Sequence, residues 1–503
     1  MAPRKVLVIV VRADPIICGH STEARNLAEA ALRDGYEPYI VTWHADLLAG
    51  SGLPLKPVNE IEPYSAGITV IRPDAVGNYK LLDGRYNLGM TSAIVEIARQ
   101  DPSMEMTIMC LYLQPHAKIV LDAVEAIRGA WGDSFNVTTI AEAVGSDITN
   151  VLANAMREQN FGAAITVLTQ FLAFDVPVCV SQFTLDECLR WARQVDDVLG
   201  TNFTERLEQK CGLSYPALDV KQYTELKPEV AEDVLARRNL QPKGYVLYLS
   251  RVIEAKGIFE LVQGYRASRL PAAGIKLLIV GRGEALESVQ AVTAGDPNIS
   301  HMTDMADAEK AAIFNGAASY ILPSKFHPTF VETFGIVITE AMLTRCGPVI
   351  TCQTGGIPEA AGKDCVYAEV DQSEDTGAYQ HILQESLRDS LNYVVLEMTE
   401  AEKEEMTAKA RAYSMQFGRE SVWAKLKAKA EEARCIKDAA KRVAVPSKRS
   451  EVFEISDEMT EPPVVGKVTA SGPPAMAKPS IGLVTDSGPA HYDSRRGLSY
   501  NCR

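Results

Sequence analysis

The segment from Leu322 to Glu359 reads LPSKFHPTFVETFGIVITEAMLTRCGPVITCQTGGIPE. Glu332 precedes a Thr-Phe-Gly break in this segment, and Glu340 follows after seven intervening residues. We expect a helix to begin near Thr333–Gly335, where unpaired backbone N–H groups and a positive dipole would favour an anion. At ~100° per residue, the two carboxylates would share one side of the helix about two turns apart. An isolated pair at this spacing is more often a surface helix with two solvated acids, so the flanking residues decide the interpretation.

The chain around this segment alternates between strand and helix patterns. In the second half we expect strands at Tyr245–Ser250, Ile275–Val280, Ser319–Leu322 and Pro348–Cys352, with helices at Gly257–Tyr265, Ala308–Asn315 and Gly335–Leu343. In the first half we expect strands at Lys5–Val11, Pro38–Thr42, Ile68–Ile71, Thr107–Leu113, Asn136–Ile140 and Pro177–Val180, with helices at Ser21–Asp34, Leu88–Arg99 and Ala117–Ile127. Such alternation is typical of parallel sheets covered by helices on both faces.

These patterns predict an α/β protein with two Rossmann-like domains that face each other across a cleft. We expect the first domain at residues 1–225 and the second at 240–400, joined by a polar segment near Asp219–Lys243. Residues 400–445 are rich in Ala, Lys and Glu and predict C-terminal helices that pack back on the core. Residues 446–503 are rich in Pro, Ser and Gly, so we expect a low-complexity, mostly disordered tail.

Composition excludes several classes of partner. The 503 residues carry a formal charge of -14, which argues against general nucleic-acid binding and against electrostatic docking on anionic lipid. No apolar run is long enough for a membrane span. The ten cysteines are scattered without a C-x-x-C pair, which favours buried thiols in a reducing compartment. We therefore expect a cytoplasmic protein without stable membrane insertion or a metal site, and association with copies of itself stays open.

Two cations lie at a predicted strand end in YVLYLSRVIEAKGIFELV, namely Arg251 and Lys256. Facing a helix start, they suit a diphosphate, which arginine binds in a planar fork and lysine as a point charge. The segment LLIVGRGEALE places Gly281 and Gly283 after the next strand, where a tight turn is at least as good an explanation as ligand contact. The third glycine of a dinucleotide fingerprint is missing, which argues against an NAD-dependent oxidoreductase.

Together, SRVIEAKG, LLIVGRGE, LPS…ETFGIVITEAM and GPVITCQTGGIPE make residues 244–362 resemble the nucleotide-sugar half of a retaining GT4-family glycosyltransferase of the GT-B fold. The first half is similar only in outline. The resemblance implies that Arg251 and Lys256 hold the donor diphosphate and stabilise the leaving group, and that Glu332 contacts the transferred sugar. It also implies that the diphosphate meets the backbone N–H groups of Phe334, Gly335 and Ile336, that Glu340 binds the ribose, and that the base lies near His301–Met305, at Met302.

The chain departs from the family pattern at three places. The approach PSKFHPTFVETFG is longer than usual, so His327, Pro328 and Thr329 could reshape the sugar pocket or form a surface loop. In the family's phosphate loop, Gly19 aligns with the second glycine of the usual pair, Cys18 replaces the first, and His20 follows. Where many relatives carry a histidine near the transferred sugar, this chain has Ala141. The adjacent Glu142 could replace that histidine, His116 could enter from the neighbouring strand end, or either side chain could be structural.

The resemblance implies a hexosyltransferase that retains anomeric configuration and uses a nucleoside diphosphate sugar, with UDP-glucose as the first choice. Front-face attack needs no dedicated nucleophile, because the diphosphate itself can take the acceptor proton. The sequence lacks a D-x-D motif, and we expect neither a metal nor a cofactor beyond the donor substrate. We expect a small or soluble acceptor. The alternatives are a non-catalytic nucleotide-sugar-binding protein, a GT-B phosphorylase or a nucleotide-sugar epimerase.

Overall fold

The computed structural model describes residues 3–48, 51–53, 55–56, 61, 63–77, 83–327, 330–370 and 376–443. The predicted tail, residues 446–503, lies outside these ranges. A search of the described helices finds none with the length and apolar character needed to cross a membrane.

Within the described residues, the first half of the chain forms a seven-stranded sheet in the order β3-β2-β1-β4-β5-β6-β7. Every neighbouring pair is parallel. The strands are β1 (Lys5–Val10), β2 (Glu37–Val41), β3 (Thr69–Ile71), β4 (Glu105–Leu111), β5 (Val137–Ala143), β6 (Val176–Cys179) and β7 (Gly212–Leu213). The order reverses direction between β1 and β4, which makes their carboxyl ends the topological switch point of the sheet.

The two faces of this sheet bury alternate residues of the same strands. Val6 and Val8 pack into a core with the helices α3 and α4, whereas Leu7 and Ile9 pack with α1 and α18 on the opposite face. The helices of this half are α1 (Gly19–Arg33), α2 (Ala45–Leu48), α3 (Gly84–Gln100), α4 (His116–Trp131), α5 (Ala153–Arg157), α6 (Phe161–Ala173), α7 (Gln182–Leu199) and α8 (Phe203–Lys210), and the π-helix η2 is Asp147–Leu152. Both faces are covered, which explains why β1 is a continuous apolar run.

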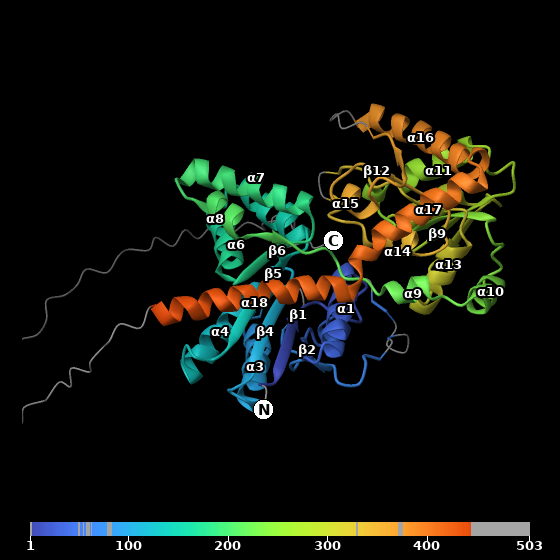
Figure 1. Ribbon diagram of the computed structural model, residues 1–503. Coiled ribbons are helices and arrows are strands. Elements are labelled where there is room, and N and C mark those ends of the chain that lie inside the picture. The colour runs from blue at the N-terminus through green and yellow to red at the C-terminus, as the bar shows by residue number, and fades with distance from the viewer. Residues whose placement is uncertain are drawn as a thin grey trace, which may run out of the picture. The chain divides into compact units, whose positions relative to one another are not determined.

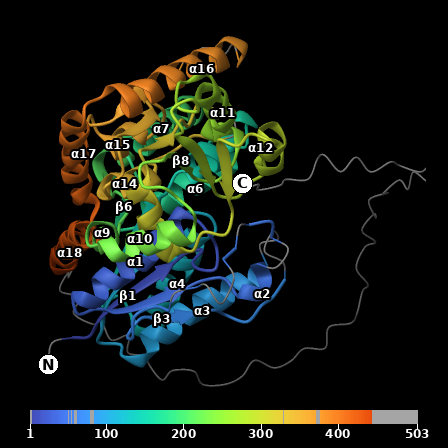
Figure 2. The ribbon, with the colours of Figure 1, turned by 90° about the vertical axis from the view of Figure 1, so that its right-hand side faces the viewer.

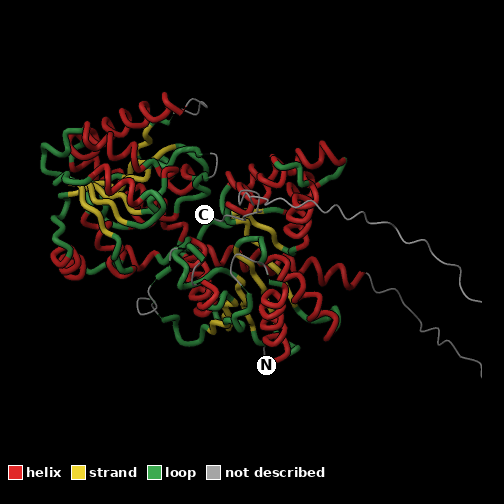
Figure 3. The backbone as a smooth tube through the Cα atoms, turned by 180° about the vertical axis from the view of Figure 1, so that it is seen from behind, coloured by secondary structure: helices red, strands yellow, loops and turns green. Residues whose placement is uncertain are grey.

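The second half forms a six-stranded sheet, again within the described residues, in the order β10-β9-β8-β11-β12-β13. Its neighbouring strands are also all parallel, and Figure 3 shows the strands of the two sheets in yellow among red helices. The strands are β8 (Tyr245–Leu249), β9 (Lys276–Val280), β10 (Ile299–Met302), β11 (Ser319–Leu322), β12 (Val349–Cys352) and β13 (Val366–Ala368). Here the switch point lies between β8 and β11.

Helices cover both faces of the second sheet around one apolar core. Two of them, α11 and α16, lie side by side in Figure 2 and are in contact. The helices are α9 (Val220–Thr224), α10 (Pro228–Arg237), α11 (Ile258–Ala267), α12 (Leu286–Thr293), α13 (Lys310–Gly316), α14 (Ile336–Leu343), α15 (Ile357–Ala361), α16 (Thr376–Asn392) and α17 (Glu400–Ser414). Shorter turns are η3 (Glu254–Lys256), η4 (Asp307–Glu309), η5 (Tyr393–Glu397) and η6 (Met415–Phe417).

The chain passes between the two sheets twice. Leu218, on the first passage, forms a parallel bridge with Gly418, on the second. Leu218 N donates to Phe417 O at 2.9 Å, and Arg419 N donates to Leu218 O at 2.8 Å. After the second passage, α18 (Arg419–Val443) returns along the first sheet, as Figure 1 shows, and buries Trp423 and Leu426 against it. The two passages are thus hydrogen-bonded to one another.

The predicted fold class, an α/β protein with two Rossmann-like parallel sheets, is confirmed. The predicted strands and helices fall within a few residues of the observed ones. Helices α7 and α8 are not among the predicted elements. The join at residues 219–243, predicted as a polar segment, carries α9 and α10.

Candidate active site

The switch point of the second sheet brings together cations and a carboxylate that are far apart in the sequence. β8 and β11 are neighbours, so the loops that follow them lie at the same edge. The first loop carries Arg251 and Lys256, and the second carries Phe330 and Glu332. Lys256 pairs with Glu332, and the Phe330 ring centroid lies 5.1 Å from Lys256 Nζ and 5.3 Å from Arg251 Cζ. Two cations thus share one aromatic ring, and one of them, Lys256, also pairs with the Glu332 carboxylate.

Lys256 is held in an unfavourable setting for a charge. Its side chain is only 7% exposed, and that of Glu332 is 15% exposed. Burial lowers the pKa of Lys256, Arg251 lowers it further through charge repulsion, and Glu332 opposes both effects. The Lys256 ammonium therefore depends on a nearby anion, which is Glu332 in this structure.

Close backbone packing shapes the loops around this pair. A Cβ at Gly281, where φ is +139°, would clash with the carbonyl oxygen of Ser250, so the loops after β8 and β9 can touch only with glycine here. This packing explains Gly281 without a ligand. A Cβ at Gly356 would likewise clash with the carbonyl oxygen of Thr333. The N–H group of Gly356 donates to Glu332 O at 2.9 Å. The backbone of the Glu332 loop is thus fixed by the Gly355-Gly356 turn.

The helix α14 begins at Ile336, after Gly335 with φ of +100°. Glu332 therefore precedes the helix and Glu340 lies within it, so the predicted placement of both carboxylates on one side of a helix is wrong. The left-handed conformation of Gly335 separates the loop from the helix, and helical spacing applies only beyond it. Phe334 is buried beside this start. The N-terminal end of α14 carries no acidic residue in its first turn, which leaves its dipole uncompensated by side chains there.

Glu340 is buried on α14 with two protein partners. Tyr223 Oη donates to Glu340 Oε1 at 2.7 Å, and Lys310 Nζ lies 2.5 Å from Glu340 Oε2. Burial raises the pKa of Tyr223, and the Glu340 charge raises it further. These partners account for the buried carboxylate, and a carboxylate keeps further acceptor positions for ligand hydroxyls. Tyr223 and Lys310 could not be predicted as partners from the sequence, because nothing local links either residue to Glu340.

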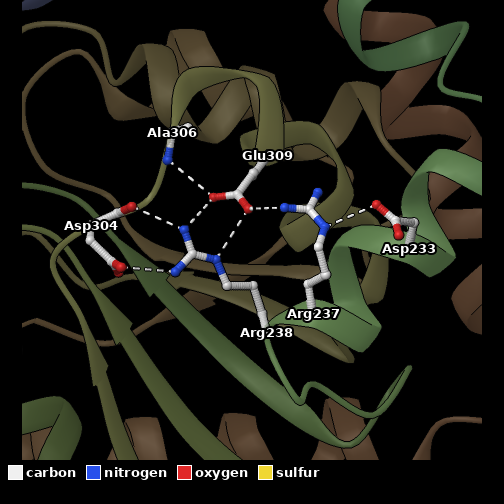
Figure 4. A network of polar contacts seen from close by, with 6 residues as sticks. All are labelled: Asp233, Arg237, Arg238, Asp304, Ala306 and Glu309. Carbon is white, nitrogen blue, oxygen red and sulfur yellow. Dashed lines mark hydrogen bonds and ion pairs between the residues drawn. The ribbon is translucent and has the colours of Figure 1, made fainter. Parts of the chain in front are cut away.

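The loop after β10, where the base is expected, is held by an ion-pair network (Figure 4). Met302 ends β10, and its carbonyl accepts a hydrogen bond from Gly281 N at 3.0 Å. Beyond it, Arg238 donates to both Glu309 oxygens, at 3.1 and 2.5 Å, and to Asp304 Oδ2 at 3.0 Å. The hydrogen bond from Arg238 is the main cause that lowers the pKa of Glu309. The network fixes the shape of residues 303–309 from the end of α10.

His327 forms an isolated bridge with Phe330 in the long approach to Glu332. Pro328 and Thr329, the other two residues expected to reshape the sugar pocket, lie outside the described residues.

On the first sheet, the predicted phosphate loop leads into α1 at the switch point. Gly19 is the first residue of α1, and a Cβ there would lie 3.1 Å from Ile336 Cδ1. The structure thus brings Gly19 and the start of α14 together. The His20 ring lies 5.8 Å from that of Tyr112. Burial lowers the pKa of His20 to about 3, with smaller contributions from neighbouring cations that include Arg251.

His116 is fully buried at the start of α4. Its Nδ1 lies 2.9 Å from Leu111 O and 3.1 Å from Tyr112 O, so this nitrogen carries the proton that the carbonyls accept. Burial lowers the pKa of His116 to about 4. Its Nε2 is buried without a hydrogen-bond partner in the described residues. The ring is therefore a neutral imidazole, anchored through one nitrogen, whose other nitrogen is an acceptor.

Glu142 is fully buried on β5 and faces a second carboxyl group, that of Glu23 on α1. Burial raises the pKa of both groups, for Glu23 to about 7, and the proximity of Glu23 raises that of Glu142 further. Such a pair is stable when it shares a proton. This placement supports the structural alternative for Glu142 over direct contact with a sugar. Glu23 is not among the predicted site residues, because nothing local in the sequence links it to Glu142.

Among the described residues, no group of three or more His, Cys, Asp and Glu side chains could hold a metal ion.

Comparison with known proteins agrees with this architecture. Residues 243–385 match the model of a family described as "Glycosyl transferases group 1". This match includes Arg251, Lys256, Glu332 and Glu340. A search of curated proteins gives no significant match.

Solved structures similar to the chain share its architecture at low sequence identity. Alr3699/HepE of Anabaena, solved with UDP and glucose, is 14% identical, with 85% of this chain and 99% of that chain covered and a TM-score of 0.56. The catalytic domain of starch synthase IV of Arabidopsis thaliana, bound to ADP and acarbose, is 13% identical, with 86% and 100% covered and a TM-score of 0.61. Sucrose-phosphate synthase of Thermosynechococcus elongatus is 18% identical, with 87% and 100% covered and a TM-score of 0.57. These similarities show that the chain has the GT-B fold.

Proposed function

We propose that this protein is a retaining glycosyltransferase of the GT4 type. It transfers a hexose, with glucose as the first choice, from a nucleoside diphosphate sugar to a hydroxyl group of a small, soluble acceptor in the cytoplasm. The observation that carries the proposal is the grouping of Arg251, Lys256 and Glu332 at one switch point, within the segment that matches group 1 glycosyl transferases. UDP-glucose is the first choice of donor because Alr3699/HepE has been solved with UDP-glucose.

The residues on this edge suit departure of a nucleoside diphosphate. When the bond between the anomeric carbon and the diphosphate oxygen breaks, negative charge grows on that oxygen. In this proposal, Arg251, Lys256 and the first N–H groups of α14 would stabilise this charge. The acceptor oxygen forms its bond to the anomeric carbon on the same face, and its proton passes to the departing diphosphate. Neither a protein nucleophile nor a metal is needed for this scheme, and homo-oligomerisation is not required.

Glu332 and Glu340 have different parts in this proposal. Glu332 lies on the loop and would accept hydrogen bonds from hydroxyls of the transferred sugar. Glu340 lies in the helix and would accept them from the ribose. Met302 ends the strand that leads into the base loop. Gly19 and His20 would close over the phosphates from the first sheet, because Gly19 already lies beside Ile336.

A thermal-shift panel of UDP-, GDP-, ADP- and TDP-sugars, followed by a donor hydrolysis assay, tests the proposal. Binding stabilises by about RT ln(1 + [L]/Kd), so millimolar ligand gives a measurable shift. Arg251→Ala and Lys256→Ala should each weaken diphosphate binding by about 1–3 kcal/mol, the cost of a lost charged hydrogen bond. Lys276→Ala is the matched control, because Lys276 is an exposed cation at the opposite end of the same sheet. Absence of a shift with all four nucleotides would refute the proposal.

A non-catalytic nucleotide-sugar-binding protein is the second candidate. The buried Glu142 favours it, because the strand end that holds a histidine in many relatives presents no exposed polar group at residues 141 and 142. Such a protein would bind one nucleotide sugar but never hydrolyse it, even slowly, whereas a transferase would hydrolyse it slowly.

The proposed retention of configuration has its own test. The anomeric configuration of a transferred product, measured by NMR, tests retention.

A further inference from the structure

Glu359, at the end of the GPVITCQTGGIPE segment, connects the two sheets. It lies on α15 of the second sheet, and its carboxylate accepts hydrogen bonds from the backbone N–H groups of Gln182 at 2.7 Å and Phe183 at 3.0 Å. These residues form the first turn of α7, which packs on the first sheet. Ser181 caps the next N–H group, that of Thr184, at 3.1 Å. Glu359 thus completes the cap of a helix that belongs to the other sheet, at the end where a negative charge is favoured.

The same turn of chain holds the loop that carries Glu332. Glu359 follows Gly355 and Gly356 by a few residues, and Gly356 N donates to Glu332 O at 2.9 Å. The packing at both glycines is so close that a Cβ would clash with the carbonyl oxygens of Glu332 and Thr333. A shift of the turn that carries Glu359 therefore moves the backbone on which Glu332 lies.

An aromatic cluster connects the other side of the Glu332 loop to the two passages between the sheets. The Phe334 ring lies 5.6 Å from that of Tyr215, on the first passage, and 5.2 Å from that of Phe417, on the second. Tyr413 packs on Phe417 at 5.7 Å, and its hydroxyl donates to Glu359 O at 2.6 Å. Phe334, which precedes the start of α14, is thus in contact with both segments that set the orientation of one sheet to the other.

We propose that Glu359 is a positioning residue, which ties the first turn of α7 to the Glu332 loop and so couples the orientation of the first sheet to the geometry of the donor site. The hydrogen bonds from Gln182 N and Phe183 N to Glu359 hold the backbone of residues 332–335 in place through the Gly355-Gly356 turn. The catalytic consequence rests on the proposed function, whereas the mechanical coupling does not. The alternative is that Glu359 only caps α7, in which case its loss would affect that helix and nothing beyond it.

Hydrogen exchange measured by mass spectrometry on the full chain separates these alternatives. Glu359→Gln changes the contact from the side of the second sheet, because it removes the negative charge of the carboxylate that caps α7. Gln182→Pro removes one of the two donors from the first sheet, and it preserves the helix because proline is favoured at the first helical position. The residue before it, Ser181, is already extended, with φ of -159° and ψ of 163°, as the residue before a proline must be. Glu404→Gln, at an exposed glutamate on α17, is the matched control.

We expect both variants to speed exchange in residues 331–336 and at Gly356 by about fivefold or more, which is the lower end of typical coupling between sites. The control should leave these rates unchanged. The Gln182→Pro result is decisive, because that change touches only the first sheet. Faster exchange confined to residues 181–186 would show that Glu359 is merely a helix cap and would overturn the proposal.

Hydrolysis of UDP-glucose supplies a second readout. In Glu359→Gln we expect kcat to fall by about 10-fold with little change in KM, because misplacement of a reacting group slows chemistry more than it weakens binding. The double variant, Glu359→Gln with Gln182→Pro, should be no slower than Glu359→Gln alone, because both changes break the same contact. Equal kcat in Glu359→Gln and the unaltered chain would overturn the coupling. If the unaltered chain binds and hydrolyses no nucleotide sugar, the proposed function fails, and the exchange rates still decide the coupling.

Discussion

Removal of the Glu332 carboxylate should strengthen diphosphate binding and should also greatly slow the hydrolysis of UDP-glucose. The buried Lys256 ammonium pairs with Glu332 in this structure, and a diphosphate in the donor site would need the same ammonium. The carboxylate and the ligand therefore compete for one cation. Glu332→Gln keeps the shape of the side chain and removes its charge, so the cation becomes fully available to the ligand.

The burial of the pair sets the size of the effect. Leaving one member of a buried ion pair without its partner costs about 3–5 kcal/mol. We take the lower end, about 3 kcal/mol, because the Glu332 side chain is still 15% exposed to water. A bound diphosphate removes part of that cost by pairing with Lys256. If it recovers about half, UDP should bind Glu332→Gln about 10-fold more tightly than the unaltered chain, since 1.4 kcal/mol corresponds to a factor of ten.

Isothermal titration with UDP, combined with hydrolysis of UDP-glucose, measures both sides of this prediction. Lys256→Met should bind UDP about 10- to 100-fold more weakly, as expected for a lost charged hydrogen bond. Glu332→Gln should bind UDP more tightly and hydrolyse UDP-glucose at least about 100-fold more slowly, as when a group that acts in the transition state is removed. Equal loss of UDP affinity in both variants would refute the competition, because Glu332 would then support the diphosphate rather than oppose it.

Two further predictions concern groups away from this pair. Arg238→Met should loosen the base loop and weaken nucleotide binding about 5- to 10-fold, at the lower end of typical coupling between sites. Arg237→Met, at a residue whose side chain is 58% exposed, should not weaken binding, and equal Kd values for the two variants in a titration would contradict this prediction. Glu142→Gln should raise the melting temperature at pH 8 by about 2–4 °C and much less at pH 5. The reason is that the pKa of Glu23 rises from 4.5 to about 7 on folding. The stability that the Glu23–Glu142 pair contributes is therefore fully present below pH 4.5 and is lost as the pH rises through 7, so removal of the second carboxyl group helps only at high pH. Melting curves at both pH values check this, and an equal shift would contradict it.

The fold could be predicted because its signal is local. Val6–Val10 and Tyr245–Leu249 are continuous apolar runs, since each strand is covered on both faces, and the intervening helices separate one run from the next. The sequence signal was weaker at the join, where α10 reads PEVAEDVLAR and buries only Ala231, Val234 and Leu235. Three apolar positions among charged residues resemble a polar linker, although proline in the first turn is a helix-start signal that could have identified this helix.

In the candidate site, too, some residues could be predicted from the sequence and others could not. Arg251, Lys256 and Glu332 could be grouped from the sequence because each follows a predicted strand, and parallel strands end at one edge of their sheet. The buried partners could not be found in this way. Tyr223 lies 117 residues from Glu340, and their contact depends on how α9 packs against α14. The positive φ of Gly335 decides where α14 begins, and that conformation is invisible to a count of residues along a helix.

The two glutamates of the motif differ in a way that their spacing conceals. Each is paired with a lysine from another element, Glu332 with Lys256 and Glu340 with Lys310. A diphosphate carries negative charge, so in the proposed donor site it would compete with Glu332 for Lys256. Ribose hydroxyls would instead donate hydrogen bonds, and because a carboxylate has about four acceptor positions, their binding to Glu340 would not require Lys310 to leave. Glu332 must therefore give up its partner during the proposed reaction and Glu340 need not, which agrees with the position of the first on a loop and of the second inside a helix.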